Sequence, residues 1–165
     1  MQIFIANIDS ISKNTDDFMA MLLPADFAHA MKFKNKVRKL QFVLGHFMVD
    51  KIGRKHTSIA HKDKFVIVAT AENMPVGVDI ENTSVKRDFV EIAEIMNFKT
   101  PKSLQDFYKY FTEYEATYKL GVKSACTHFI TYGDYLICIV SNHQFAKPHL
   151  KTFNAELFLT PKKEQ

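Results

Sequence analysis

The sequence has no tryptophan, only two cysteines and no long run of apolar residues. Cys126 and Cys138 form no C-x-x-C pair and lie among apolar residues, so we expect two reduced core thiols. The seven histidines show no zinc-ligand spacing with one another or with cysteine. Residues 2–6 are too short an apolar run for a signal peptide or a membrane span. We therefore expect a soluble, cytoplasmic protein with no zinc site and no membrane association.

Acidic residues are absent from residues 27–49, where five basic residues gather. These are Lys32, Lys34, Lys36, Arg38 and Lys39. The net charge is only +4, so its distribution says more than its size. Such a patch favours an anionic ligand, an acidic protein or nucleic acid, and is also typical of a solvated helix face. We expect no nucleic acid as partner, because nearby aromatics such as Phe47 belong to an apolar helix stripe.

The sequence contains helix and strand signals for one α+β domain of 165 residues, enough to bury a real core. Strands are expected at about 2–8, 57–61, 65–69, 75–81, 127–132 and 135–141, with one more allowed within 149–160. Helices are expected at about 14–22, 33–51, 86–97 and 102–121, the last with Pro101 at its first position and Gly121 at its end.

The helix expected at 33–51 carries an apolar stripe at helical spacing. Its members are Val37, Leu40, Leu44, Phe47 and Met48. Lys34 and Arg38, four residues apart, would lie together off that stripe. Pro24 would interrupt the chain before this helix, and Gly53 would end it.

The two hairpins resemble each other at an offset of 70 residues, and each follows a long amphipathic helix. Thr57, Ile59, Phe65, Val66, Ile67 and Ala69 fall on Thr127, Phe129, Tyr135, Leu136, Ile137 and Ile139. This predicts one domain built from two similar α/β halves, approximately 1–74 and 75–165, with a site at their junction.

The stretch at 75–81 alternates between two kinds of residue. Read as a strand, it places Val76, Val78 and Ile80 on an apolar face. Asp79 and Glu81 share the other face, where two carboxylates can reach one hard cation such as Mg²⁺. The alternative is an ordinary edge strand with a solvated acidic face.

A third carboxylate, Glu115, falls inside an apolar stripe of the helix expected at 102–121. The stripe consists of Leu104, Tyr108, Phe111 and Tyr118. A carboxylate on the core-facing side of a helix is costly unless it is paired or bound to a metal. One reading is a simple ion pair with Lys119, one turn later. The other is a Mg²⁺–phosphate site shared with Asp79 and Glu81.

Four segments resemble, in order and spacing, the motifs of the 4'-phosphopantetheinyl transferases. Residues 76–81 (VGVDIE) match G-(V/I)-D-(I/V)-E, and residues 111–121 (FTEYEATYKLG) resemble W-(S/T)-x-K-E-(A/S)-x-x-K-x-x-G. Residues 58–61 (SIAH) resemble N-(I/V/L)-S-H, and Arg38 with the leucines that follow resembles R-x-x-L-x-x-x-L. The resemblance covers roughly residues 1–145.

This resemblance implies a short, divergent member of the family, related to holo-acyl-carrier-protein synthases and acting as a monomer. The implied reaction moves 4'-phosphopantetheine from coenzyme A to a serine of an apo acyl or peptidyl carrier protein. Adenosine 3',5'-bisphosphate would be released, in lipid or secondary-metabolite biosynthesis.

The resemblance also implies roles for particular residues. Asp79, Glu81 and Glu115 would hold Mg²⁺ against the pyrophosphate, and Glu115 would also accept the serine proton. Lys119 would neutralise charge on the phosphate. The coenzyme A phosphates would be bound by Arg38, His61 and Lys34, although His61 could equally be a core or turn histidine.

Three substitutions and one missing element depart from the family pattern, and these departures affect turnover more than fold. Tyr114 stands where the family has lysine, Phe111 replaces tryptophan and Ala60 replaces serine. A G-K-P element is missing, and Gly53-Arg54 is the nearest candidate. The alternative function is therefore a degenerate member that binds coenzyme A or a carrier protein without turnover.

Overall fold

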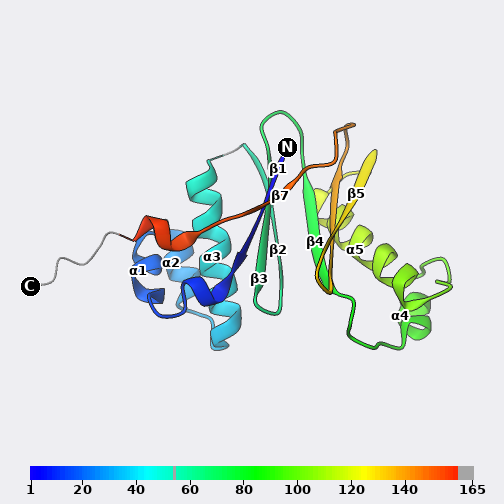
Figure 1. The fold of residues 1–165 in the computed structure, drawn as a ribbon, viewed down its shortest axis with the longest axis horizontal. Coiled ribbons are helices and arrows are strands. Elements are labelled where there is room, and N and C mark those ends of the chain that lie inside the picture. The colour runs from blue at the N-terminus through cyan, green and yellow to red at the C-terminus, as the bar shows by residue number, and fades with distance from the viewer. Residues whose placement is uncertain (54, 160–165) are drawn as a thin grey trace, which may run out of the picture.

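Two hairpins and the strands paired with them build the two sheets of this α+β protein (Figure 1). The computed structural model describes residues 1–53 and 55–159. The first sheet has the strand order β2 (His56–Lys62), β3 (Phe65–Ala71), β1 (Gln2–Asn7) and β7 (Leu150–Thr152). Its pairs are antiparallel except β7, which runs parallel to β1. The second sheet is antiparallel, in the order β4 (Gly77–Asn82), β6 (Tyr135–Ser141) and β5 (Cys126–Tyr132).

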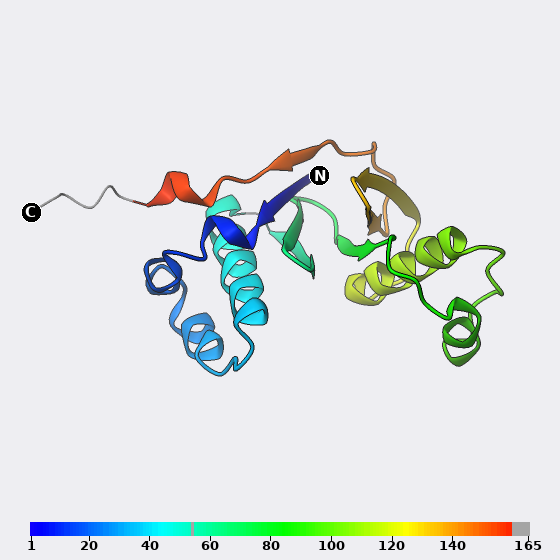
Figure 2. The same cartoon turned by 60° about the horizontal axis from the view of Figure 1, so that its bottom comes forward.

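Helices cover the outer faces of both sheets, so the layers run helix, sheet, sheet, helix (Figures 1 and 2). The first sheet is covered by α3 (Lys36–Ile52), on which α1 (Thr15–Ala20) and α2 (Pro24–Ala30) pack. The second is covered by α5 (Leu104–Leu120), on which α4 (Phe89–Ile95) packs. Single 3₁₀ turns occur at Ile8–Ser10 and Ala155–Phe158. In the described part of the chain, no helix is long and apolar enough to cross a membrane.

The central strands β3 and β6 are buried on both faces, which explains why they are continuous apolar runs. Ile67 and Ile137 share one buried cluster between the two sheets, whereas Val66 packs toward the first helical layer and Val140 toward α5. The expected strands and both hairpins are confirmed, and so is the optional last strand, as β7.

Two expectations about α3 are wrong. The helix begins at Lys36, because the Asn35 side chain caps it by accepting a hydrogen bond from the Arg38 backbone amide at 3.0 Å. Lys34 therefore precedes the helix and does not share a helical face with Arg38. Val37 is 45% exposed and lies outside the buried stripe. Pro24, expected only to interrupt the chain, begins the additional helix α2 at a position that proline favours.

The start and the rotation of α5 also differ from expectation. Ser103 is the N-cap, accepting from the Asp106 amide at 3.1 Å, so Pro101 stays outside the helix. Gly121 ends α5 as expected, in a left-handed conformation with φ 74°. Tyr118, predicted to be buried, is 77% exposed. The buried residues of α5 are Phe107, Tyr108, Thr112, Ala116 and Leu120.

Small residues explain this rotation of α5. A Cβ atom placed on Gly77 of β4 would lie 2.0 Å from the Ala116 carbonyl oxygen, so only glycine allows so close an approach. The helix therefore turns Ala116 toward β4 and leaves the bulky Tyr118 outside. This close packing sets the distance between the side chains of β4 and α5.

Of the two cysteines, Cys138 is buried as expected, whereas Cys126 is only half-buried, and both are free thiols. Burial raises the pKa of the Cys138 thiol well above its ordinary value, which keeps it protonated and unreactive.

Candidate functional site

The two sheets meet along the edge strands β2 and β4, and the candidate site lies at this junction. The Val78 backbone amide donates a hydrogen bond to the Ser58 hydroxyl at 3.1 Å, which links β4 to β2. As predicted, Val78 and Ile80 face the cluster between the sheets. Asp79 and Glu81 occupy the opposite face, but each is only 8% exposed, so the solvated acidic face is ruled out.

Asp79 is held by a lysine from α5. The Lys119 ammonium donates to Asp79 Oδ1 at 2.8 Å and to the Val78 carbonyl oxygen at 3.1 Å. The simple pair between Glu115 and Lys119 is thus replaced by a pair between two distant motifs. Asp79 Oδ2 is buried and has no hydrogen-bond partner among the described residues. A buried carboxylate oxygen without a partner is costly, and a bound cation would satisfy it.

Burial and the two other predicted carboxylates act on the ionisation of Asp79. Burial raises the pKa of Asp79 to about 6, and the charges of Glu81 and Glu115 raise it further, against the opposing effect of Lys119. Asp79 is therefore half-protonated near pH 6 in the metal-free protein. Among residues 1–53 and 55–159, however, no three His, Cys, Asp or Glu side chains are already arranged around one metal position.

The donor chemistry nevertheless fits a hard divalent cation. Carboxylate oxygens are the ligands that Mg²⁺ prefers, and Asp79 offers one that is buried and unbonded. Ammonium and guanidinium groups supply positive charge to Glu81 and to Asp79 itself. The carboxylate donor set therefore suits Mg²⁺ chemically, although no three such ligands are assembled around one position among the described residues.

Two cations that the sequence did not reveal bind Glu81. Lys62 Nζ lies 2.7 Å from Glu81 Oε2, and Arg87 Nη2 lies 3.3 Å from the same oxygen. The Arg87 guanidinium also lies over the rings of Tyr108 and Phe111 on α5, at 5.8 and 5.7 Å. Neither contact could be predicted from local spacing in the sequence.

Arg38 of α3 and His61 of β2 contact each other through their side chains. Arg38 Nη1 lies 2.9 Å from Nδ1 and 2.8 Å from Nε2 of His61, and 3.3 Å from the Gln41 side-chain oxygen. Burial and the Arg38 charge lower the pKa of His61, so the imidazole is neutral at pH 7 and accepts from Arg38. Both residues line a cavity of about 180 Å³. Its other lining residues are Phe33, Gln41, Phe42, His46 and Ile59.

Lys34 lies in the segment between α2 and α3 and is exposed. It is absent from the lining of the cavity that holds Arg38 and His61. Arg54, the other basic residue considered for phosphate binding, lies outside the described residues.

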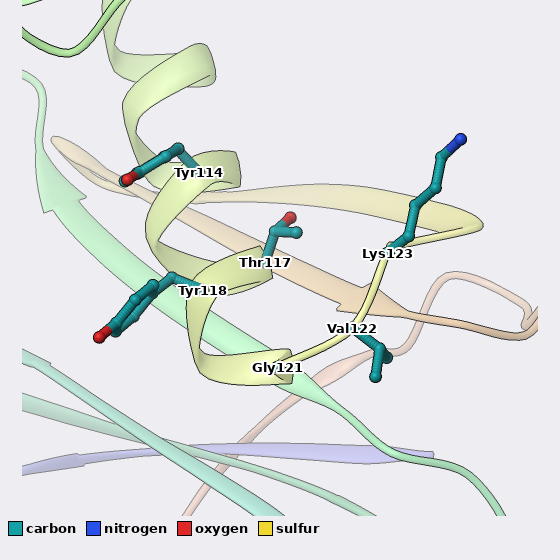
Figure 3. A pocket seen from close by; sticks show the side chains of 6 residues that line it. All are labelled: Tyr114, Thr117, Tyr118, Gly121, Val122 and Lys123. Atoms are coloured by element: carbon teal, nitrogen blue, oxygen red, sulfur yellow. The ribbon is translucent and has the colours of Figure 1, made fainter.

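The outer side of the α5 C-terminus carries a second, open pocket of about 510 Å³ (Figure 3). Tyr114 and Tyr118 project to the same side of the helix there, with Val122 at the far end. The Tyr114 ring packs edge-on against Phe98, with centroids 5.1 Å apart. Tyr114 thus contributes to an aromatic surface and supplies no cation to the carboxylates.

No protein-family model matches the chain, and no curated protein matches it either. The functional argument therefore depends on the motifs and on the contacts between them.

Proposed function

We propose that this protein is a Mg²⁺-dependent 4'-phosphopantetheinyl transferase that modifies a serine of an acyl or peptidyl carrier protein. One contact carries the proposal: Lys119 binds Asp79 at 2.8 Å across 40 residues of sequence. The two most specific motifs of the family resemblance thus meet at one part-buried ion pair. A coincidental resemblance of two separate segments gives no reason for such a contact.

In the proposed site, Asp79, Glu81 and Glu115 would hold Mg²⁺. A metal ion bound there would supply positive charge for the diphosphate of coenzyme A. Arg38 and His61 bind further phosphate oxygens of the same substrate. Because His61 is neutral, it would donate one N–H hydrogen bond to the phosphate and carry no positive charge. Arg38 supplies the positive charge.

Transfer requires that one bond forms and one breaks. The serine oxygen of the carrier bonds to the phosphorus that bears the pantetheine arm, and Glu115 accepts the serine proton. The bond from that phosphorus to the bridging oxygen breaks, and adenosine 3',5'-bisphosphate leaves with the electron pair. Lys119 lies one turn from Glu115 and neutralises charge on the phosphate as the leaving group departs.

The architecture is in keeping with two similar halves, which we include in the proposal. In each half a long helix, α3 or α5, packs on a hairpin, β2–β3 or β5–β6. The site then lies at the junction of the halves within one chain, so a monomer is sufficient. A cytoplasmic location follows from the proposed carrier substrate.

Two observations favour a second candidate, a protein that binds coenzyme A without turnover. Asp79 and Glu81 already carry cations, and Tyr114 packs on Phe98 where the family pattern has a lysine. A slow or absent chemical step would follow from the loss of that charge.

Release of adenosine 3',5'-bisphosphate, followed by chromatography, tests the proposal. The wild type should release it only when coenzyme A, Mg²⁺ and an apo carrier protein are all present. A carrier whose acceptor serine is replaced by alanine is the control for hydrolysis. Coenzyme A binding without release would support the second candidate, and absence of both would overturn the two together.

A further inference from the structure

The Lys62–Glu81 pair is the shortest of the ion pairs at the candidate site. Lys62 Nζ lies 2.7 Å from Glu81 Oε2, compared with 3.3 Å for Arg87 and 2.8 Å for Lys119 on Asp79. The Lys62 side chain is 23% exposed and approaches from the end of β2, the strand that also carries His61. Lys62 thus joins the Arg38–His61 part of the site to the carboxylates of β4.

From these contacts we infer that Lys62 is a phosphate-binding residue that exchanges partners. In the metal-free protein it occupies Glu81 in place of a metal ion. When Mg²⁺ takes Glu81, the Lys62 ammonium moves to a diphosphate oxygen of coenzyme A. This inference rests on the proposed function and adds to it a cation that the sequence motifs do not contain.

The exchange follows from the chemistry of the oxygen that the two cations share. A divalent metal bound at Glu81 Oε2 would compete with the Lys62 ammonium for that oxygen, and its double charge would weaken the Lys62 pair. The displaced ammonium, still beside the metal-bound substrate, has a new anionic partner in the phosphate. Lysine suits this exchange because its ammonium is a point charge on a flexible stem.

Arg87 does not share this freedom. Its guanidinium lies over Tyr108 and Phe111, two rings of α5 that hold it in one place. Arg87 therefore acts as a fixed positioning group at Glu81. For the Lys62 ammonium, the contact that the structure gives is Glu81. The prediction of movement applies to Lys62 alone.

The test uses Lys62→Gln, with Lys64→Gln as matched control. Lys64 is two residues away in the same hairpin, and its ammonium lies over the Phe65 ring rather than on a site carboxylate. Each variant loses one positive charge, so a general charge effect would appear in both. Urea unfolding of each variant verifies that it is folded.

Two affinities are measured by titration calorimetry: Mg²⁺ alone, and coenzyme A at saturating Mg²⁺. We expect Lys62→Gln to bind Mg²⁺ roughly fivefold more tightly, because a competitor of ion-pair strength is removed. It should bind coenzyme A at least about tenfold more weakly, because a charge-assisted hydrogen bond to phosphate is lost. Lys64→Gln should change neither affinity by more than about twofold.

The opposite signs of the two effects make the outcome decisive. Weaker binding of both ligands by Lys62→Gln would mean a structural role, and unchanged coenzyme A affinity would mean that Lys62 never reaches the phosphate; either result overturns the inference. In both cases the wild type still binds coenzyme A, so the proposed function stands. A wild type that binds no coenzyme A overturns the function and the inference together.

Discussion

Replacing Asp79 by asparagine is expected to change how the stability of the fold depends on pH. The pKa of Asp79 is about 6 in the folded protein, against an ordinary value of 3.8, mainly because the carboxyl is buried. Each pKa unit corresponds to about 1.4 kcal/mol, so ionised Asp79 costs the folded state about 3 kcal/mol at pH 7. The folded state binds more protons than the unfolded chain between these two pKa values. Stability must therefore fall as the pH rises through this window.

Asparagine has no such titration. It introduces a constant offset, because the amide cannot reproduce both the Lys119 contact and the environment of the buried Oδ2. The free energy of unfolding of the variant minus that of the wild type is measured at each pH. The constant offset is the same at every pH, so it cancels when these differences are compared. We expect this difference to move in favour of Asp79→Asn by about 2 kcal/mol between pH 4 and pH 7.

Urea unfolding at pH 4, 5, 6 and 7 in the presence of a chelator measures the difference directly. Mg²⁺ added at pH 7 should then stabilise the wild type but leave Asp79→Asn unchanged, because binding to the folded state raises stability by mass action. A difference that stays flat from pH 4 to pH 7 would refute the argument that burial controls the ionisation of Asp79.

Three further predictions concern the same site and the packing behind it. Glu115→Gln should lower transfer at least about 100-fold without lowering the urea midpoint, because it removes a base and ligand from a half-buried position. Asp79→Ala should also lower transfer at least about 100-fold, and wild-type transfer rates in either variant would remove the metal-site assignment. Gly77→Ala should lower the free energy of unfolding by more than about 2 kcal/mol, since its Cβ meets the Ala116 carbonyl oxygen, and an unchanged urea midpoint would contradict the close approach of α5. Hydrogen bonds from Asn82 and Tyr135 lower the pKa of Asp63, so Asp63→Asn should destabilise the protein at pH 7. This destabilisation should disappear as the pH falls below 4, because wild-type Asp63 then becomes protonated. A stability difference that does not change with pH would argue against those hydrogen bonds.

The strand positions and the carboxylate face could be predicted because they depend on local alternation. Side chains of a strand point alternately to two faces, so the grouping of Asp79 with Glu81 follows from sequence alone. The turn at Gly133 and the helix end at Gly121 follow from residues that tolerate positive φ. The burial of both carboxylates could not be predicted, because it depends on how α5 covers β4.

The partners of the carboxylates were missed for the same physical reason. Lys62 reaches Glu81 because the edges of the two sheets meet, and sequence spacing carries no signal of that contact. Arg87 reaches Glu81 from the segment that follows β4, six residues along the chain, and a loop of that kind has no regular spacing from which to predict the contact. The rotation of α5 was misjudged because Tyr118 was counted as a core residue. In the fold, the approach of Ala116 to Gly77 decides the rotation, and aromatic size works against burial there.

The most direct test of the central claim is the intact mass of an apo acyl carrier protein after incubation with this protein, coenzyme A and Mg²⁺. Our account predicts a mass gain of one phosphopantetheine group on the acceptor serine, abolished by a chelator and by Glu115→Gln. An unchanged mass with acyl and peptidyl carriers alike, from a wild type that is folded and supplied with Mg²⁺, would contradict it.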